Sequence, residues 1–437
     1  MSTAASMPWP ETSPGDTGPG NDTQRAATPM RVAPLDGVRI IDCSLLGPGS
    51  LAMHLADLGA DVIKVEPPGG DPLRRTTWPM VDGVSLMHLH VNRNKRSVGI
   101  DLRTHDGADV FRDLVRTADA VIEGMRPGAL ARRGLGYHDL EAVNPRLVFC
   151  SISGFGSTGP YRDVPSHGVA FDAWAGVVAP EVDDAGACAI PEHPSIGIHA
   201  GPLFGALGVT AAILRARTTG EGSYLEVAQS DAAASMDWLR SETWMSYRHR
   251  DRAGIVDGSG DERRAPGTAG MRHGVRYQFY ATKDDRHILF MASERVFWHN
   301  FCRGIGRLDL FEAWPGEERG DHATGNTELR DELIRIFAAR TAADWVDFAA
   351  RHDTAIAPVN TPGSLPDDPQ FRERFSLYRA DELGTHQLPS PIRFHDTSPT
   401  TPTKAPTTGQ HTDEVLQREL GCDTETITRL RRSGAVH

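Results

Sequence analysis

The chain is poor in cysteine and has no long apolar run. Its 437 residues include five cysteines, which lie far apart and form no C-x-x-C pair. A disulfide framework or a cysteine-bound zinc ion is therefore not expected, and a reducing cytoplasm is the expected location. No stretch of about 18 consecutive apolar residues occurs, so the sequence predicts no membrane span.

Basic residues are outnumbered by acidic ones. Lysine and arginine together number 46, aspartate and glutamate number 58, and the net charge is −12. Binding to nucleic acid generally requires a basic surface, so we expect no nucleic-acid partner. An anionic small molecule is still compatible with this charge, because a local cluster of basic side chains can outweigh the total. The sequence indicates no metal cofactor.

The first 33 residues differ in composition from the rest of the chain. They are rich in Pro, Gly, Ser and Thr, and they lack the charged start and apolar centre of a signal peptide. We predict that residues 1–33 form a disordered tail. Beyond Pro34, segments typical of strands and helices alternate to about residue 225. This alternation predicts an α/β fold with a parallel sheet covered by helices on both faces.

The most informative stretch covers residues 37–75. An apolar strand over Val38–Ile41 leads into a loop of glycine and proline, an amphipathic helix over 51–58, and a second strand that ends at Glu66. In outline this is half of a Rossmann fold, where amides at a helix start meet phosphates. The loop is not G-x-G-x-x-G, so the nicotinamide fingerprint is absent. Further along, residues 202–216 are mostly small and apolar, and we predict a buried helix there.

Six segments carry a resemblance to one family, and they occur in family order over nearly the whole ordered chain. Together they resemble class III CoA-transferases, a family that includes formyl-CoA transferase, carnitine CoA-transferase and α-methylacyl-CoA racemase. The segments are LADLGADVIKVEPPGGDPLRR (55–75), NRNKRSVGIDLRT (92–104), DAVIEGMRPGALARRGLG (119–136), NPRLVFCSISGFGSTGPY (144–161), GSYLEVAQSDAA (222–233) and HTDEVLQRELG (411–421).

The resemblance implies an architecture that periodicity alone does not reveal. It implies a large Rossmann-like domain that begins with residues 34–230, and a smaller α+β domain over 231–345. Residues 346–437 would form a linker and the C-terminal part that completes the large domain. The resemblance also implies an interlocked homodimer whose substrates are acyl-CoA and a free carboxylic acid.

Coenzyme A, carried as acyl-CoA, calls for basic side chains and an apolar slot. The resemblance indicates the turn after NKRS, the segment after Glu123 and the arginines of ALARR as its contacts. Family members often place an arginine directly after the acid that closes the second strand, but here Pro67 follows Glu66, so Arg74 or Arg75 would take that role. The predicted CoA-binding residues are Arg74, Arg75, Lys95, Ile100, Arg103, Gly124, Met125, Arg132 and Arg133.

The residue that would perform CoA transfer is missing from its expected place. Transferases of the family use an aspartate that attacks the thioester, which requires a carboxylate nucleophile. At the corresponding position this chain has Ile198 or His199, depending on a one-residue gap. The nearest upstream acids are Glu192 and Asp183, and either could be a displaced nucleophile.

The racemase branch of the family offers another interpretation. It moves the proton alpha to a thioester carbonyl and needs a base on each face of that carbon. The resemblance places His167 on one such base, and His199 could oppose it, since an imidazole suits proton transfer near neutral pH. Asp172 could orient His167, or it could be an ordinary acid at a helix start. We favour a racemase-like isomerase, with CoA transfer and an inactive CoA-binding scaffold as the alternatives.

Overall fold

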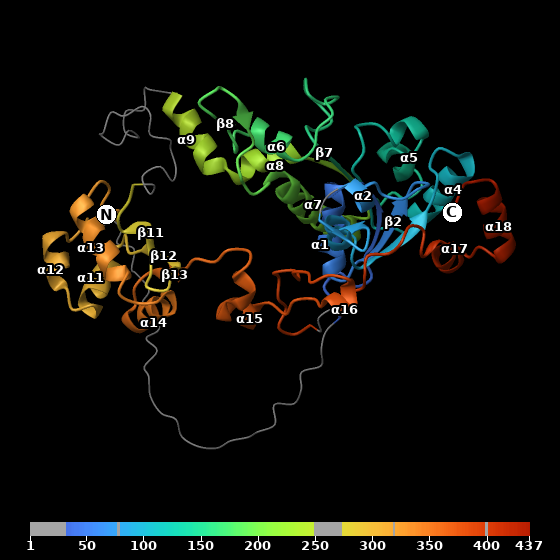
Figure 1. The fold of residues 1–437 in the computed structure, drawn as a ribbon. Helices are drawn as coiled ribbons and strands as arrows, with labels where there is room; N and C mark the ends of the chain where they lie inside the picture. Colours follow the sequence, from blue (N-terminus) through green and yellow to red (C-terminus); the bar gives the residue numbers. More distant parts are fainter. Residues whose placement is uncertain (1–31, 77–78, 249–272, 318–319, 398–400) are drawn as a thin grey trace, which may run out of the picture.

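The computed structural model describes residues 32–76, 79–248, 273–317, 320–397 and 401–437. The predicted disordered tail lies outside the described residues except for its last two. Two units are visible in Figure 1: a larger one around a six-stranded sheet and a smaller one around three strands. The segment with α15 (Pro369–Arg374) and α16 (Ala380–Leu383) runs between them.

A parallel sheet forms the centre of the larger unit. Its strand order is β10-β7-β6-β1-β2-β5, and every neighbouring pair is parallel. The chain builds outward from β1 in one direction and then from β6 in the other, which is the strand order of a Rossmann fold. The predicted α/β class is therefore confirmed. The strands are β1 (Arg39–Cys43), β2 (Asp61–Glu66), β5 (Lys95–Gly99), β6 (Ala120–Glu123), β7 (Val148–Ser153) and β10 (Ser223–Ala228).

Helices cover both faces of this sheet because successive strand residues point in opposite directions. Ile40 belongs to the core cluster under α1 and α7, whereas its neighbour Ile41 belongs to the cluster under α4, α5, α17 and α18. The two faces are thus closed by separate apolar clusters. The helices are α1 (Ser50–Asp57), α4 (His105–Val115), α5 (Tyr137–Glu141), α7 (Gly197–Thr219), α17 (Thr412–Leu420) and α18 (Thr424–Arg432).

Helix α7 is longer than the predicted segment 202–216. By length and composition alone it could span a membrane. One side of it packs into the core: a Cβ at Gly205 would lie 2.3 Å from Cδ1 of Leu51, so the two helices approach closely. Its other side is exposed and apolar, with Leu203, Leu207 and Leu214 at 54%, 66% and 70% exposure. The helix is therefore a core helix that keeps an uncovered apolar face.

The smaller unit is an antiparallel sheet with helices packed around an aromatic core. Trp298, Phe301, Phe337 and Trp345 are fully buried there. The domain boundary that we predicted at 345/346 falls inside α14, and the unit continues to Pro358. Its elements are β11 (Tyr277–Ala281), β12 (His287–Met291), α11 (Arg295–Gly304), α12 (Leu308–Ala313), α13 (Thr327–Phe337), α14 (Ala342–His352) and β13 (Ile356–Pro358).

The end of the chain returns to the edge of the large sheet. Ile100 forms an antiparallel bridge with Val436, and the amide of His411 donates to the carbonyl of Ser97 at 2.8 Å. The remaining elements connect or flank these units. They are η1 (Gly47–Gly49), α2 (Leu73–Thr76), β3 (Met80–Val81), β4 (Val84–Ser85), α3 (Leu86–Val91), η2 (Ala131–Arg133), α6 (Val169–Trp174), β8 (Glu181–Val182), β9 (Cys188–Ala189), α8 (Gln229–Met236), α9 (Trp238–Arg248), η3 (Leu365–Asp367), α15 (Pro369–Arg374) and α16 (Ala380–Leu383).

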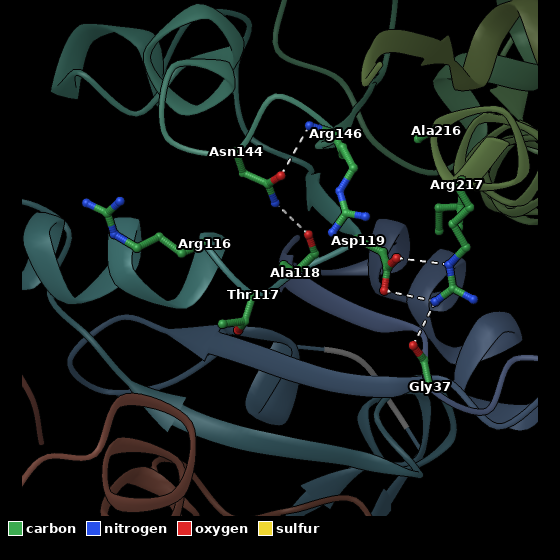
Figure 2. Close-up of a pocket in the computed structure, with 10 residues that line it drawn as sticks. Gly37, Arg116, Thr117, Ala118, Asp119, Asn144, Arg146, Ala216 and Arg217 are labelled. Atoms are coloured by element: carbon green, nitrogen blue, oxygen red, sulfur yellow. Dashed lines mark hydrogen bonds and ion pairs between the residues drawn. The ribbon is translucent and has the colours of Figure 1, made fainter. Parts of the chain in front are cut away.

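A small cavity lies at the amino ends of β1, β6 and β7. It has a volume of about 280 Å³, and Arg116, Arg146 and Arg217 are among its lining residues (Figure 2). Arg217 is already paired with Asp119, whose carboxylate also accepts from the amide of Arg39 at 2.9 Å. This cavity is at the opposite edge of the sheet from the strand ends where ligands of parallel sheets bind.

Candidate functional site

The strand order places the candidate site between the carboxyl ends of β1 and β6. Open parallel sheets bind ligands where the order of strands reverses, because the loops on either side diverge there. Residues 44–49 leave β1 at this point, and Gly124 follows β6. A Cβ at Gly124 would lie 2.9 Å from Cβ of Pro48 and 3.2 Å from Cβ of Ser44. Glycine therefore lets the two loops meet where the strand order reverses.

Four buried charged side chains hold the loop of residues 44–49 from beneath, and we call them the loop clamp: Asp42, Lys64, Asp71 and Lys95. The ammonium of Lys95 donates to Asp42 at 2.8 Å and to the carbonyl of Gly49 at 2.7 Å. The ammonium of Lys64 donates to the carbonyl of Ser44 at 2.9 Å and lies 3.0 Å from the carboxylate of Asp71.

The two carboxylates of the loop clamp accept from amides of the same loop. Asp42 accepts from the amide of Ser44 at 2.9 Å, and Asp71 accepts from the amide of Leu46 at 3.4 Å. Burial would raise the pKa of Asp42, but the nearby ammonium groups of Lys95 and Lys64 outweigh it and hold that pKa below its ordinary value. Burial lowers the pKa of Lys95 to about 8, against the attraction of Asp42.

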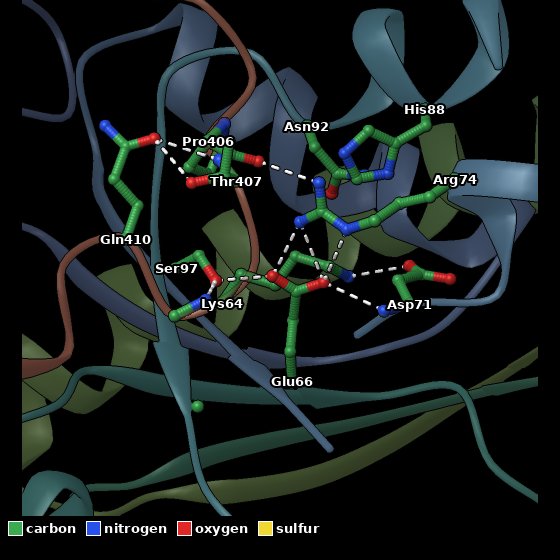
Figure 3. Close-up of polar contacts among 12 residues, drawn as sticks. Lys64, Glu66, Asp71, Arg74, His88, Asn92, Ser97, Pro406, Thr407 and Gln410 are labelled. Atoms are coloured by element: carbon green, nitrogen blue, oxygen red, sulfur yellow. Dashed lines mark hydrogen bonds and ion pairs between the residues drawn. The ribbon is translucent and has the colours of Figure 1, made fainter. Parts of the chain in front are cut away.

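Glu66, at the end of β2, is the hub of a neighbouring polar cluster (Figure 3). Its buried carboxylate accepts from Arg74 at 2.8 Å, from the amide of Asp71 at 2.9 Å and from the hydroxyl of Ser97. Arg74 also donates to the carbonyl of Pro406 at 3.0 Å. Arg74 thus ties the predicted CoA edge to the returning C-terminal segment.

The predicted CoA-binding residues fall into a buried or partly buried group, which is bound to other parts of the protein, and an exposed group. In the first group, Lys95 and Ile100 are buried and Arg74 is partly buried. The ammonium of Lys95 makes a third hydrogen bond, to Asn92 at 3.1 Å, and Arg74 is paired with Glu66. Arg103 is exposed but donates to Asp101 at 2.7 Å. Arg132 and Arg133 are exposed and donate to backbone carbonyls, and Arg75 is exposed on α2. Gly124 packs against the loop, and the amide of Met125 donates to Glu123 at 2.9 Å.

The predicted catalytic residues lie around the start of α7. His199 is exposed in the first turn of α7, and His167 is exposed in the loop before α6. Asp172 is fully buried and accepts from the amides of Ile196 at 3.2 Å and Gly197 at 2.8 Å. Its carboxylate therefore holds the beginning of α7, and its nearest imidazole in the described structure is His193 at 3.4 Å.

The family model described as CoA-transferase family III matches residues 35–412, most of the chain. The chain belongs to this family. A relative named succinyl-CoA–L-malate CoA-transferase beta subunit, from Chloroflexus aurantiacus, is 30% identical and covers 92% of this chain and 98% of its own. The succinyl-CoA:glutarate CoA-transferase of Mus musculus is 28% identical, with 92% and 90% covered. A solved CAIB/BAIF family protein from Brucella suis is 26% identical, has a TM-score of 0.69, and covers 89% of this chain and 100% of its own.

These comparisons confirm the family that the six segments indicated, and they favour the transferase branch. The relatives reported are named for CoA transfer, which does not support the racemase-like preference that we drew from His167 and His199. The family's CoA-transferases act on acyl-CoA and carboxylic acids. The structure shows one chain, so the predicted interlocked dimer stays a prediction.

The acids that could replace the missing nucleophile are unequally placed. Asp183 accepts from the amides of Ala185 and Ala187 at 2.9 and 2.8 Å, so its carboxylate closes the turn between β8 and β9. Glu192 is exposed in the loop that leads to α7. Among the residues that the structure describes, no group of three or more His, Cys, Asp or Glu side chains is arranged to hold a metal ion.

Sequence reasoning missed two features of this site. Asp42, Lys64 and Asp71 were not singled out, although a charged residue inside an apolar strand, such as Asp42 in β1 or Lys64 in β2, signals a buried polar network. Glu123 was named only as part of a strand and of a segment that carries the family resemblance, and no role was predicted for its side chain. It is 4% exposed, burial raises its pKa, and its carboxylate accepts from the hydroxyl of Ser151. An acid that ends a strand at the ligand-binding edge is the signal that could have identified it.

Proposed function

We propose that this protein takes part in CoA transfer between an acyl-CoA thioester and a small carboxylic acid. One observation carries the proposal: full-length relatives named for that reaction match more than 90% of the chain. The structure is compatible with it. The exposed Arg75, Arg132 and Arg133 could meet the phosphates of CoA, and the loop of residues 44–49 would face the thioester.

The attacking carboxylate must come from outside the first turn of α7, which contains no acid. We propose Glu192 for this role, because it is exposed and precedes α7 by only a few residues. Its carboxylate would attack the thioester carbonyl, form a mixed anhydride and release CoA as a thiolate. The thiolate would then attack the Glu192 carbonyl and release the first acid. The acceptor acid completes the exchange through the same two steps in reverse.

A transfer assay tests this function directly. Succinyl-CoA is mixed with the protein and a panel of dicarboxylic acids, and new acyl-CoA species are identified by mass spectrometry. We expect a new thioester with at least one acid, and a covalent CoA adduct on the Glu192 peptide that Glu192→Gln removes. Asp183→Asn is the matched control and should keep the adduct. Absence of any new thioester with the whole panel would contradict the proposal.

Proton transfer alpha to a thioester is the second candidate, and one observation favours it: His199 occupies the exposed first turn of α7. Its test is incubation of the protein with a 2-methylacyl-CoA in D2O. Deuterium at the alpha carbon that disappears in His199→Ala, but persists in the exposed His138→Ala, would establish this reaction. CoA binding with neither reaction would leave a CoA-binding scaffold.

We also propose that the protein works as a homodimer in the cytoplasm. Helices α7, α8 and α9 each expose large apolar side chains, and exposed apolar surface often marks an interface between chains. All five cysteines are free, which suits a reducing compartment. The exposed apolar residues are Leu203, Leu207 and Leu214 on α7, Met236 on α8, and Trp238, Leu239, Trp244 and Met245 on α9.

A further inference from the structure

The loop of residues 44–49 is held in a conformation that the chain would not adopt by itself. Leu46 has a φ of 60°, in the left-handed region that side chains other than glycine rarely occupy. Loops are ordinarily the most mobile parts of a fold. Here the carbonyls of Ser44 and Gly49 and the amides of Ser44 and Leu46 are all bound by charged side chains of the loop clamp.

The loop clamp is a costly way to stabilise a fold. Asp42 and Lys64 are fully buried, and Lys95 and Asp71 are 2% exposed. Burying two ion pairs costs a desolvation free energy that offsets much of their electrostatic attraction. Apolar residues of similar size often stabilise a protein as well or better. The clamp lies on the α1 face of the sheet, next to an apolar core cluster and to the buried carboxylate of Glu66. Stability alone does not account for four charges at this place.

The position of the loop of residues 44–49 offers a reason for the four buried charges beneath it. It packs against Gly124 of the β6 loop, and η1 within it packs against α7, whose first turn carries His199. The β1 loop and the β6 loop lie where the strand order reverses, and parallel sheets bind their ligands at such a point. A shift of about 1 Å in a group that positions a substrate can cost about 100-fold in rate. A rigid loop at this position would therefore favour the reaction rate even if it lowered the free energy of unfolding.

We propose that the loop clamp is a positioning device for the acyl-CoA reaction: it fixes the wall of residues 44–49 against which the thioester is held. This inference rests on the proposed handling of acyl-CoA at the same point of the sheet, by transfer or by proton exchange. Asp42, Lys64, Asp71 and Lys95 act through the loop backbone and do not touch the substrate. The acyl-CoA is expected to bind to an already ordered loop.

The test is a double variant that removes charge from the clamp without leaving a charge unpaired. Asp42→Asn combined with Lys95→Met should fold with an unfolding free energy close to that of the original chain. We expect kcat to fall about 100-fold, while KM for acyl-CoA changes by less than about threefold. The control is Asp61→Asn, which removes an ion pair with Arg96. This pair lies near the amino ends of β2 and β5, away from the loop of residues 44–49.

Hydrogen exchange of the loop gives a second measurement that does not depend on turnover. Peptides covering 44–50 should exchange faster in the double variant and be unchanged in Asp61→Asn. A double variant with normal kcat and a protected loop would overturn the positioning role. If the original chain neither binds nor converts acyl-CoA, the proposed function fails instead, and the exchange data still report whether the clamp orders the loop.

Discussion

At the scale of one residue, Lys95 is a buried charge whose proposed role is to order the loop of residues 44–49 more than to raise the free energy of unfolding of the protein. Burial lowers its pKa from 10.5 to about 8, so it loses its proton in the folded protein within an accessible pH range. The groups that face it are Asp42, Lys64, Asp71 and His54. The ammonium of Lys95 donates three hydrogen bonds, to Asp42, Gly49 and Asn92. Loss of one proton therefore removes one of these three bonds.

This leads to a pH prediction with two opposite signs. Between pH 8 and 10.5 the unfolded chain holds more protons at Lys95 than the folded chain does, so this group makes the unfolding free energy rise with pH. The loop, in contrast, should loosen as the ammonium is lost. Hydrogen exchange of peptides covering 44–50, corrected for intrinsic rates, should increase from pH 7 to pH 9. A Lys95→Met chain that shows the same pH-dependent increase would contradict the assignment to Lys95.

Asp172 gives a prediction about stability. Its carboxylate accepts from two amides at the start of α7, and loss of such a helix cap typically costs about 0.5–2 kcal/mol. Asp172→Ala should therefore lower the free energy of unfolding in urea by about that amount or more, because the residue is fully buried. Asp163→Ala, on an exposed loop, is the control and should change it by less than about 0.5 kcal/mol. An unchanged midpoint for Asp172→Ala would show that it does not hold α7.

Single residues were the hardest level to predict from the sequence. Asp172 lies in the first turn of α6, a helix-start position that was one of its two predicted interpretations, but its carboxylate accepts from amides at the start of α7, 24 and 25 residues away. Lys95 was predicted to contact CoA because it is basic and lies in a family segment. Only the three-dimensional register of β5, β2 and β1 shows that it reaches Asp42 and Gly49. Burial and long-range pairing are set by tertiary packing, which residue type does not encode.

At the scale of elements, the β1 loop and the β6 loop are in close contact where the strand order reverses. A methyl group at Gly124 would meet Pro48 and Ser44 at 2.9 and 3.2 Å. We expect Gly124→Ala to weaken acyl-CoA binding by about 1–3 kcal/mol through the strain of the displaced loop. Calorimetric titration with acyl-CoA measures this. Gly363→Ala is the control, because its new methyl would meet only Thr361, at 3.8 Å; equal binding by both variants would contradict the prediction.

Elements were predicted better than residues because their signals are local. The run from Val38 to Glu66 was predicted as strand, loop, helix and strand, and the structure has β1, η1, α1 and β2 there. Helix α7 was predicted too short because its first residues, such as Gly197 and His199, lack an apolar pattern. The smaller unit extends past the predicted boundary because α14 and β13 join it through packing, and no composition change marks that point.

For the whole molecule, the uncovered face of α7 and α9 predicts self-association. Leu207 and Leu214 on α7 are 66% and 70% exposed, and α9 also exposes large apolar side chains. Exposed apolar surface of this kind often marks an interface between protein chains. We expect light scattering after gel filtration to give the mass of a dimer. Leu207→Glu with Leu214→Glu should give a monomer, because two buried carboxylates would face an apolar partner. Ile334→Glu on α13 is the control; a monomeric original chain would refute the prediction.

The bridge between Ile100 and Val436 has a consequence for how the chain acquires its structure during synthesis. The sheet edge at β5 and the helices α17 and α18 belong to the same core, yet more than three hundred residues separate them in sequence. The larger unit therefore cannot close while residues 412–437 are still inside the ribosome. The smaller unit, whose strands and helices lie within 275–358, is complete well before that. The unit translated in the middle is thus free to mature first, and an arrested nascent chain would expose the unfinished sheet to chaperones.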